Sequence, residues 1–275
     1  MADRDKEIEL LKGEIRRLRE EIARLTPPLE TLLKIRRYYV YKRKPAEMPL
    51  LPEDRFIDKY YNLLGHYSFR LFIRDVIKFQ DAFSVEDVTR YTAGDVTKHY
   101  ISILKEMRLV ESSGGLYRLV KRPVRSFGPT LEWFVSGIFE REFVTEALWG
   151  LRFKRRNVGG DYDVIAKLNG GIIYIEVKSS PPKQVYQSEI SAFYNRVEDL
   201  SPEIAIFFMD TELRMKDKIV LMFEEELDHR GLNPEVIRME KELFHISNRI
   251  FIINAKGGIE NNIEKVIRWH LLYNK

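Results

Sequence analysis

The chain has 275 residues, of which 44% are hydrophobic and 12% aromatic, so it can bury a substantial core and is sized for about two domains. It contains no cysteine, which excludes disulfide scaffolds, cysteine-ligated metal sites and thiol nucleophiles. The charged start MADRDKEIELL has no signal-peptide core, and no apolar run reaches the ~20 residues of a membrane span. We therefore expect a cytoplasmic protein with no membrane partner.

The formal net charge of +4 is unevenly distributed along the chain. Residues 1–126 contain 26 basic and 19 acidic side chains, whereas residues 127–275 contain 20 and 23. A basic first half indicates contact with a polyanion, and a slightly acidic second half indicates a different task.

Residues 1–26 form a heptad repeat with isoleucine at position a and leucine at position d, which favours a parallel two-stranded coiled coil. These residues are Ile8, Ile15, Ile22, Leu11, Leu18 and Leu25. Glutamates at position g (Glu7, Glu14) would face basic residues at position e (Lys12, Arg19), and Pro27-Pro28 ends the helix. The repeat predicts a homodimer joined through this segment. The alternative is a single amphipathic helix that lies on its own protein.

Residues 27–66 are expected to form a basic, tyrosine-rich connector, helical in two pieces around its prolines. Its basic stretch, KIRRYYVYKRK, combines cations that neutralise phosphates with tyrosines that can stack on bases. The candidate nucleic-acid contacts are Arg36, Arg37, Tyr38, Lys42, Arg43 and Lys44. The alternative is a solvated basic linker.

Residues 67–126 are predicted to contain three helices followed by a β-hairpin. An apolar helix begins near residue 69, Ser84 caps a short second helix, and a third helix spans 95–107. Two short strands then flank the glycine turn at 112–115. This order resembles the winged helix-turn-helix family.

The resemblance implies that the third helix enters the major groove of DNA. Its apolar face is expected to be Val96, Tyr100, Ile103, Leu104 and Met107. The side chains off that face would then contact DNA: Thr97, Lys98, His99, Ser102 and Lys105. Lys121, Arg122 and Arg125 could hold phosphates. The alternative is a domain that mediates only protein contacts.

Residues 127–275 alternate helices and strands, which predicts an α/β domain. We expect a helix over 129–147, a basic loop over 152–160 and then two strands. A helix over 187–199, a strand over 204–209, a helix over 216–230, a strand over 250–254 and a closing helix over 259–272 follow.

The two strands after residue 160 are joined at Asn169-Gly170, a strong signal for a two-residue type I′ turn. Counting back from this turn places Asp163 opposite Glu176 and Asp161 opposite Lys178. Two carboxylates directly opposed are costly unless a cation lies between them. The alternative is a structural salt bridge between Lys178 and Asp161.

The hairpin resembles the PD-(D/E)xK, or restriction-endonuclease-like, nuclease superfamily, in the form of Mrr-type restriction enzymes and archaeal Holliday-junction resolvases. The motif is Gly159-Gly160-x-x-Asp163-Val-Ile-Ala followed by Ile175-Glu176-Val177-Lys178. Tyr162 stands where the PD of the family name has a proline before its aspartate. The resemblance implies a mixed central sheet, metal binding by Asp163 and Glu176, and catalysis by Lys178. It assigns the family's helical glutamate to Glu132, with Glu140 and Glu142 as weaker candidates.

Phosphodiester hydrolysis needs a Lewis acid and an available nucleophile, and Mg²⁺ (or Mn²⁺) supplies both. Asp163, Glu176 and the Val177 carbonyl are the expected ligands, and Asp161 is either a further ligand or the partner of Lys178. We therefore predict a multidomain, metal-dependent DNA endonuclease. The alternatives are a DNA-binding regulator or architectural dimer with an inactive nuclease-like domain, and a scaffold protein.

Overall fold

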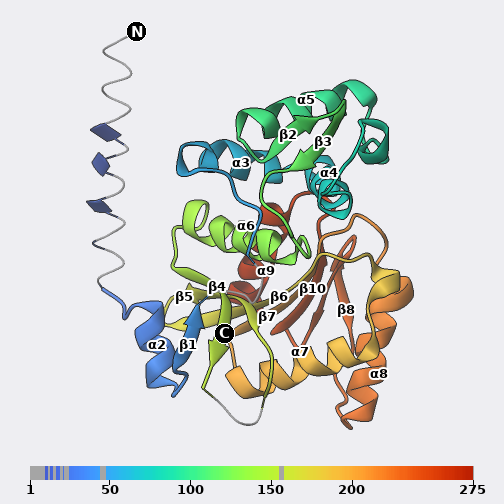
Figure 1. The fold of residues 1–275 in the computed structure, drawn as a ribbon. Helices are drawn as coiled ribbons and strands as arrows, with labels where there is room; N and C mark the ends of the chain where they lie inside the picture. The colour runs from blue at the N-terminus through green and yellow to red at the C-terminus, as the bar shows by residue number, and fades with distance from the viewer. Residues whose placement is uncertain are drawn as a thin grey trace.

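A computed structural model describes residues 10–11, 13–14, 17–18, 21, 25–43, 48–154 and 158–274. Its centre is an eight-stranded sheet with the order β1-β4-β5-β6-β7-β10-β9-β8 (Figure 1). The strands are β1 (Val40–Arg43), β4 (Ala147–Phe153), β5 (Tyr162–Leu168), β6 (Gly171–Lys178), β7 (Ile204–Met209), β8 (Ile237–Glu240), β9 (Leu243–Ile246) and β10 (Ile250–Asn254). Because β6, β7 and β10 are parallel and the other neighbours antiparallel, the sheet is mixed, as expected.

Helices cover both faces of this sheet (Figure 1). They are α2 (Leu29–Ile35), α3 (Ile57–Leu64), α4 (Tyr67–Lys78), α5 (Gly94–Glu106), α6 (Gly128–Arg141), α7 (Gln187–Leu200), α8 (Leu221–His229) and α9 (Ile259–Tyr273). One apolar cluster packs α7 and α8 against one face of the sheet. A second cluster packs α3, α4, α5, α6 and α9 against the other face. Alternate residues of β6 divide between the two clusters, Ile173 and Ile175 in one and Ile172 and Tyr174 in the other, since successive strand residues point to opposite faces.

The segment predicted as three helices and a hairpin has that order of elements. The second helix is a single 3₁₀ turn at Glu86–Val88, and the hairpin pairs β2 (Val110–Ser113) with β3 (Leu116–Leu119). This segment shares one apolar cluster with the sheet, because Val124, Phe127 and Leu131 continue its packing into α6. A winged-helix role and the boundary at residue 126 stay predictions.

Two expected nucleic-acid contacts are wrong because their side chains are buried. Thr97 is 0% exposed, since its hydroxyl bonds the Thr92 hydroxyl at 2.6 Å, while Val96, expected in the core, is 40% exposed. Tyr38 is 3% exposed, because its ring packs edge-on against Phe153 at a centroid distance of 5.1 Å. The other expected contacts on α5 are exposed, as are Lys121, Arg122 and Arg125.

The basic connector also contains β1, which the sequence analysis did not predict. This edge strand pairs with β4, so the connector is part of the sheet. Arg36 forms an ion pair with Glu203 (2.5 Å), and Arg37 is exposed. The side chains of Lys42 and Arg43, and all of Lys44, lie outside the described residues.

Part of the heptad repeat also lies outside the described residues, including Ile8, Ile15 and Ile22. Leu11, Leu18 and Leu25 are described, and all three side chains are exposed. Dimerisation through this segment stays a prediction. In the described part of the chain, no helix is both long and apolar enough to span a membrane.

Candidate active site

The β5–β6 hairpin brings together the acidic residues that the motif singled out. Asn169 and Gly170 form the turn with φ values of +48° and +143°, and Leu168 pairs with Gly171 as the spacing predicts. The register continues to Val164 opposite Ile175, so Asp163 and Glu176 occupy the next positions of their strands. Asp163 Oδ2 accepts a 2.7 Å hydrogen bond from the Val177 backbone N–H. The hairpin therefore fixes Asp163 beside the strand that carries Glu176 and Lys178.

Glu176 lies at the centre of this cluster and is 2% exposed. Its Oε1 accepts from Lys178 Nζ (2.9 Å) and Arg196 Nη2 (2.7 Å). Its Oε2 accepts from Arg196 Nε (3.2 Å) and from the Tyr174 hydroxyl. Because a carboxylate offers about four lone-pair positions, these contacts saturate Glu176. A cation reaches this carboxylate only if one donor withdraws.

The two carboxylates have pKa values shifted in opposite directions. Burial, followed by the negative charges of Glu176 and Glu132, raises the pKa of Asp163 well above its usual value. Burial alone would raise the pKa of Glu176, but the positive charges of Lys178 and Arg196 outweigh it and hold that pKa below its usual value. Asp163 is therefore the carboxylate whose ionised form lacks compensation, and a cation would supply it.

Lys178 is held in its protonated form. Burial would lower its pKa, but the carboxylates of Glu176 and Asp163 and the hydrogen bond that Lys178 donates to Glu189 raise it above its usual value. Glu189 binds Lys178 Nζ at 2.9 Å through Oε1, and its Oε2 accepts the Tyr186 backbone N–H at 3.0 Å. The ammonium therefore has a fixed position at the end of β6.

The pairing of Asp161 with Lys178 is wrong. Asp161 instead forms an ion pair with Arg152 of β4, through both of its carboxylate oxygens. It precedes β5 and lies outside the paired part of the hairpin, so the register count does not extend to it. Lys178 forms its ion pairs with Glu176 and Glu189, not with Asp161.

The three glutamates considered on the preceding helix differ in position. Glu132 is half-buried in the second turn of α6, near enough to Asp163 to raise its pKa. Glu140 is exposed at the other end of the helix, and Glu142 follows that end and accepts a 3.4 Å hydrogen bond from Tyr61. Of the three, Glu132 is the one whose charge acts on the hairpin.

The sequence analysis missed Glu189 and Arg196, which both lie on α7. They are seven residues apart, so they face the same side of the helix, but this spacing does not show which residues that side meets. Tyr174, two residues before Glu176, was also missed because it reads as an ordinary core residue.

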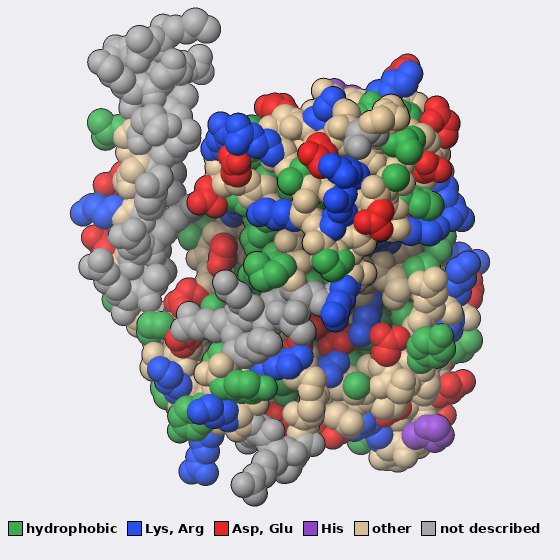
Figure 2. Space-filling view, in the orientation of Figure 1, with side chains coloured by type: hydrophobic (Ala, Val, Ile, Leu, Met, Phe, Trp, Pro, Cys, Tyr) green, Lys and Arg blue, Asp and Glu red, His purple; other side chains and the backbone are tan. Residues whose placement is uncertain are grey.

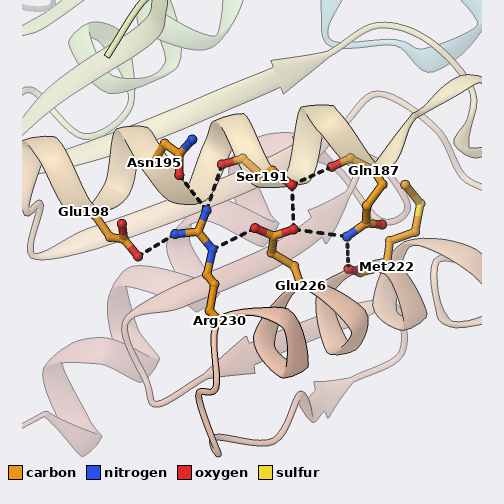
Figure 3. Close-up of polar contacts among 7 residues, drawn as sticks. All are labelled: Gln187, Ser191, Asn195, Glu198, Met222, Glu226 and Arg230. Carbon is orange, nitrogen blue, oxygen red and sulfur yellow. Dashed lines mark hydrogen bonds and ion pairs between the residues drawn. The ribbon is translucent and has the colours of Figure 1, made fainter. Parts of the chain in front are cut away.

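A polar cluster around the buried side chain of Glu226 holds α7 against α8 (Figure 3). Glu226 of α8 accepts hydrogen bonds from Ser191 (2.5 Å) and Gln187 (3.3 Å) and from the Arg230 guanidinium (2.7 Å). Arg230 also reaches Asn195 and Glu198, as Figure 3 shows. These contacts fix the helix that presents Glu189 and Arg196 to the end of β6.

The site has few oxygen ligands, and these suit a hard divalent cation. Asp163 offers a carboxylate oxygen, and Glu176 offers one once Lys178, Arg196 or Tyr174 withdraws. Mg²⁺ is commonly held by one or two carboxylates together with waters and substrate phosphates. Among the described residues, no group of three or more Asp, Glu or His side chains could hold an ion by itself. The residues therefore fit a cation that is completed by the substrate, rather than one held in a protein cage.

Comparisons with known proteins add little to this geometry. No family model and no curated protein matches the chain. A solved structure of protein VC1899 from Vibrio cholerae is 12% identical, with a TM-score of 0.39, and the match covers 80% of this chain. Can2 from Sulfobacillus thermosulfidooxidans, solved in complex with cyclic tetra-adenylate, is 11% identical, with a TM-score of 0.46 and 88% of this chain covered. The matches span 54% and 60% of those chains, and both likenesses are too distant to carry an argument about this protein.

Proposed function

We propose that the protein is a metal-dependent nuclease that hydrolyses phosphodiester bonds of DNA at the Asp163–Glu176–Lys178 site. The observation that carries this proposal is that the half-buried carboxylate of Asp163 lies beside the strand of the buried carboxylate of Glu176, with a lysine two residues beyond Glu176 on that strand. The resemblance of this motif to PD-(D/E)xK nucleases supports the same reaction class. The alternative is a DNA-binding protein with an inactive site, which the saturation of Glu176 by Lys178, Arg196 and Tyr174 favours.

The chain's own residues divide the work as follows. A bound Mg²⁺ would supply Lewis-acid activation of the phosphate and of water, with Asp163 and Glu176 as its protein ligands. Lys178, held protonated by Glu176 and Glu189, neutralises the charge that develops on the phosphate. Glu132, whose negative charge acts on Asp163, would accept a proton from water.

Basic side chains outside this site would hold the DNA. Lys98, His99, Ser102 and Lys105 are exposed on α5, and Lys121, Arg122 and Arg125 follow the hairpin of β2 and β3. Cations on one element and the chain that follows it neutralise several phosphates at once. We include DNA binding by this surface in the proposal.

A cleavage assay with charge-removing variants tests the proposed function. Supercoiled plasmid, branched DNA and single-stranded DNA are incubated with Mg²⁺, Mn²⁺ or EDTA. We expect cleavage only with metal, and we expect Asp163→Asn, Glu176→Gln and Lys178→Met to reduce the rate by about a hundredfold or more while DNA binding persists. Glu264→Gln, at an exposed ion pair of α9, is the matched control and should cleave normally.

Two outcomes would contradict the nuclease proposal. Cleavage that survives in EDTA or in all three variants would place the activity elsewhere. Tight DNA binding with no cleavage of any substrate, and no Mn²⁺ binding by calorimetry, would favour the inactive DNA-binding protein.

A further inference from the structure

A cavity of about 790 Å³ lies between the helical segment and the sheet. One wall comes from α4 and the chain before α5, including Tyr67, Arg74 and Tyr91. The other comes from residues 179–184, directly after Lys178, and from 210–213, directly after β7. Its volume falls within the ~300–1,000 Å³ range of ligand sites in proteins. Figure 2 shows the surface hollowed between the upper helical part and the sheet below, with blue Lys and Arg side chains gathered beside it.

The lining is basic and contains tyrosines. The basic residues are Arg74, Lys78, Arg90, Arg125 and Lys183, and the acidic ones are Asp75, Asp210 and Glu212. Asp210 is already neutralised by ion pairs with Arg70 (2.8 Å) and Arg74 (2.5 Å), so the balance is positive. The Arg90 guanidinium lies 5.1 Å from the centroid of the Tyr91 ring, and that ring is 47% exposed. This combination suits a chain of phosphates whose bases stack on aromatic rings.

Two polar atoms of lining residues are removed from solvent without a partner. Arg74 Nε and Asp75 Oδ2 are both buried and find no hydrogen bond among the described residues. Buried donors and acceptors are normally satisfied, so this wall holds one donor and one acceptor whose hydrogen-bonding capacity is unused.

The cavity borders the end of the strand that carries Glu176 and Lys178. Ser179 and Ser180 line it and follow Lys178 in the chain. The Asp210 backbone N–H donates a 2.9 Å hydrogen bond to the Lys178 carbonyl, so the lining is bonded to the strand that carries Glu176 and Lys178. The lining of the cavity therefore begins at the residue that follows Lys178.

We propose that this cavity binds an unpaired stretch of nucleic acid, with phosphates on its basic residues and bases against Tyr67 and Tyr91, and that this stretch leads to Lys178. Stacking on a side chain requires unpaired bases, because those of a duplex are enclosed in their own stack. The inference rests on the proposed function, since it names single-stranded or frayed nucleic acid as what the site receives.

Binding measured without catalysis tests this inference separately from nuclease activity. Fluorescein-labelled oligothymidylate and a blunt duplex of equal length are titrated by fluorescence anisotropy in EDTA. Arg90→Glu/Lys183→Glu removes one cation from each wall, Tyr91→Ala removes a stacking ring, and Arg268→Glu, in an exposed ion pair of α9, is the matched control. Circular dichroism melts verify that each variant is folded.

We expect the double variant to weaken oligothymidylate binding at least tenfold and to lower the slope of log affinity against log salt by about 0.7 for each lost phosphate contact. Tyr91→Ala should weaken it about fivefold or more, and neither change should alter duplex binding as much. The control should bind both probes as the wild type does.

Unchanged oligothymidylate binding in both cavity variants would overturn the inference, even if the wild type cleaves DNA. An equal loss of duplex and single-strand binding would also overturn it, as would displacement of the strand by thymidine monophosphate at similar affinity. Selective loss of single-strand binding by a protein that cleaves nothing would support the cavity site while the proposed nuclease function fails.

Discussion

Asp163 and Glu176 are the same kind of group at neighbouring positions, yet their surroundings treat them differently. Glu176 is neutralised by Lys178 and Arg196, whereas Asp163 receives one backbone N–H and faces the charges of Glu176 and Glu132. The unfavourable electrostatic energy of the two neighbouring carboxylates therefore acts mainly on the ionised form of Asp163. Strain of this kind is typical of sites that trade stability for chemistry.

The stability of the metal-free protein should depend on Asp163 in a defined direction. Because its pKa is raised in the folded state, the native protein binds more protons than the unfolded chain between the usual carboxyl pKa of ~3.9 and the raised value. The stabilisation is present below the unfolded pKa and is lost as the pH rises through the folded pKa. Asp163→Asn should therefore be more stable than wild type at pH 8 in EDTA, by about 0.5–2 kcal/mol.

Urea denaturation at pH 4 and pH 8 measures this difference, which should shrink at the lower pH. Asp228→Asn, at an exposed position of α8, should show no comparable gain. A variant less stable than wild type at pH 8 would mean that the Val177 N–H bond outweighs the repulsion.

At the scale of an element, α5 combines a buried face and a basic exposed face. Tyr100, Ile103 and Leu104 are buried beside Thr97, and Lys98 and Lys105 are exposed. The buried face of α5 is rotated slightly from the predicted one, because Thr97 is buried and Val96 is exposed. Lys98 and Lys105 stay available for phosphates.

Charge reversal on α5 should weaken duplex DNA binding without changing its sequence preference. Lys98→Glu/Lys105→Glu removes two cations, so the slope of log affinity against log salt should fall by about 0.9 for each lost phosphate contact. Anisotropy titrations at several salt concentrations measure this slope, with Lys216→Glu, at an exposed position of the chain before α8, as control. If affinity and slope are unchanged, DNA is held by another surface.

At the scale of the whole molecule, a buried ion pair joins the helical segment to the sheet. Arg70 of α4 (1% exposed) and Asp210 after β7 (0% exposed) bond at 2.8 Å, and Arg70 also donates to the carbonyls of Leu64 and Gly65. Arg74 bonds the same carboxylate at 2.5 Å. The Asp210 carboxylate thus links α4 to the C-terminal ends of β6 and β7, where Lys178 also lies.

Removing this carboxylate should be costly. Asp210→Ala leaves Arg70 buried without its counter-charge, and we expect the free energy of unfolding to fall by about 3–5 kcal/mol. Guanidinium denaturation measures the loss. Glu264→Ala, which removes an exposed ion pair, should cost less than about 1 kcal/mol. A similarly small effect for Asp210→Ala would show that apolar packing alone joins the two parts.

The sequence by itself determined the elements whose signal is local. The Asn169-Gly170 turn set the hairpin register because a two-residue turn leaves one pairing, and the apolar runs of β7 and β10 gave both strands their observed bounds. It did not predict β1, β4, β8 or β9. The edge strand β1 has only four residues, the edge strand β8 exposes Arg238 and Glu240, and β4 contains a glycine and an arginine, so the pairing of these strands depends on neighbours that only the fold supplies.

The tertiary structure alone decided which charges meet. Asp163, Glu176 and Lys178 could be placed by counting along one hairpin, but Arg196 lies 20 residues beyond Glu176, and Arg70 lies 140 residues before Asp210. Contacts at such separations depend on how α4 and α7 pack on the sheet, and no local pattern encodes that packing. The same packing forms the cavity beside Lys178, because its two walls come from segments far apart in the sequence.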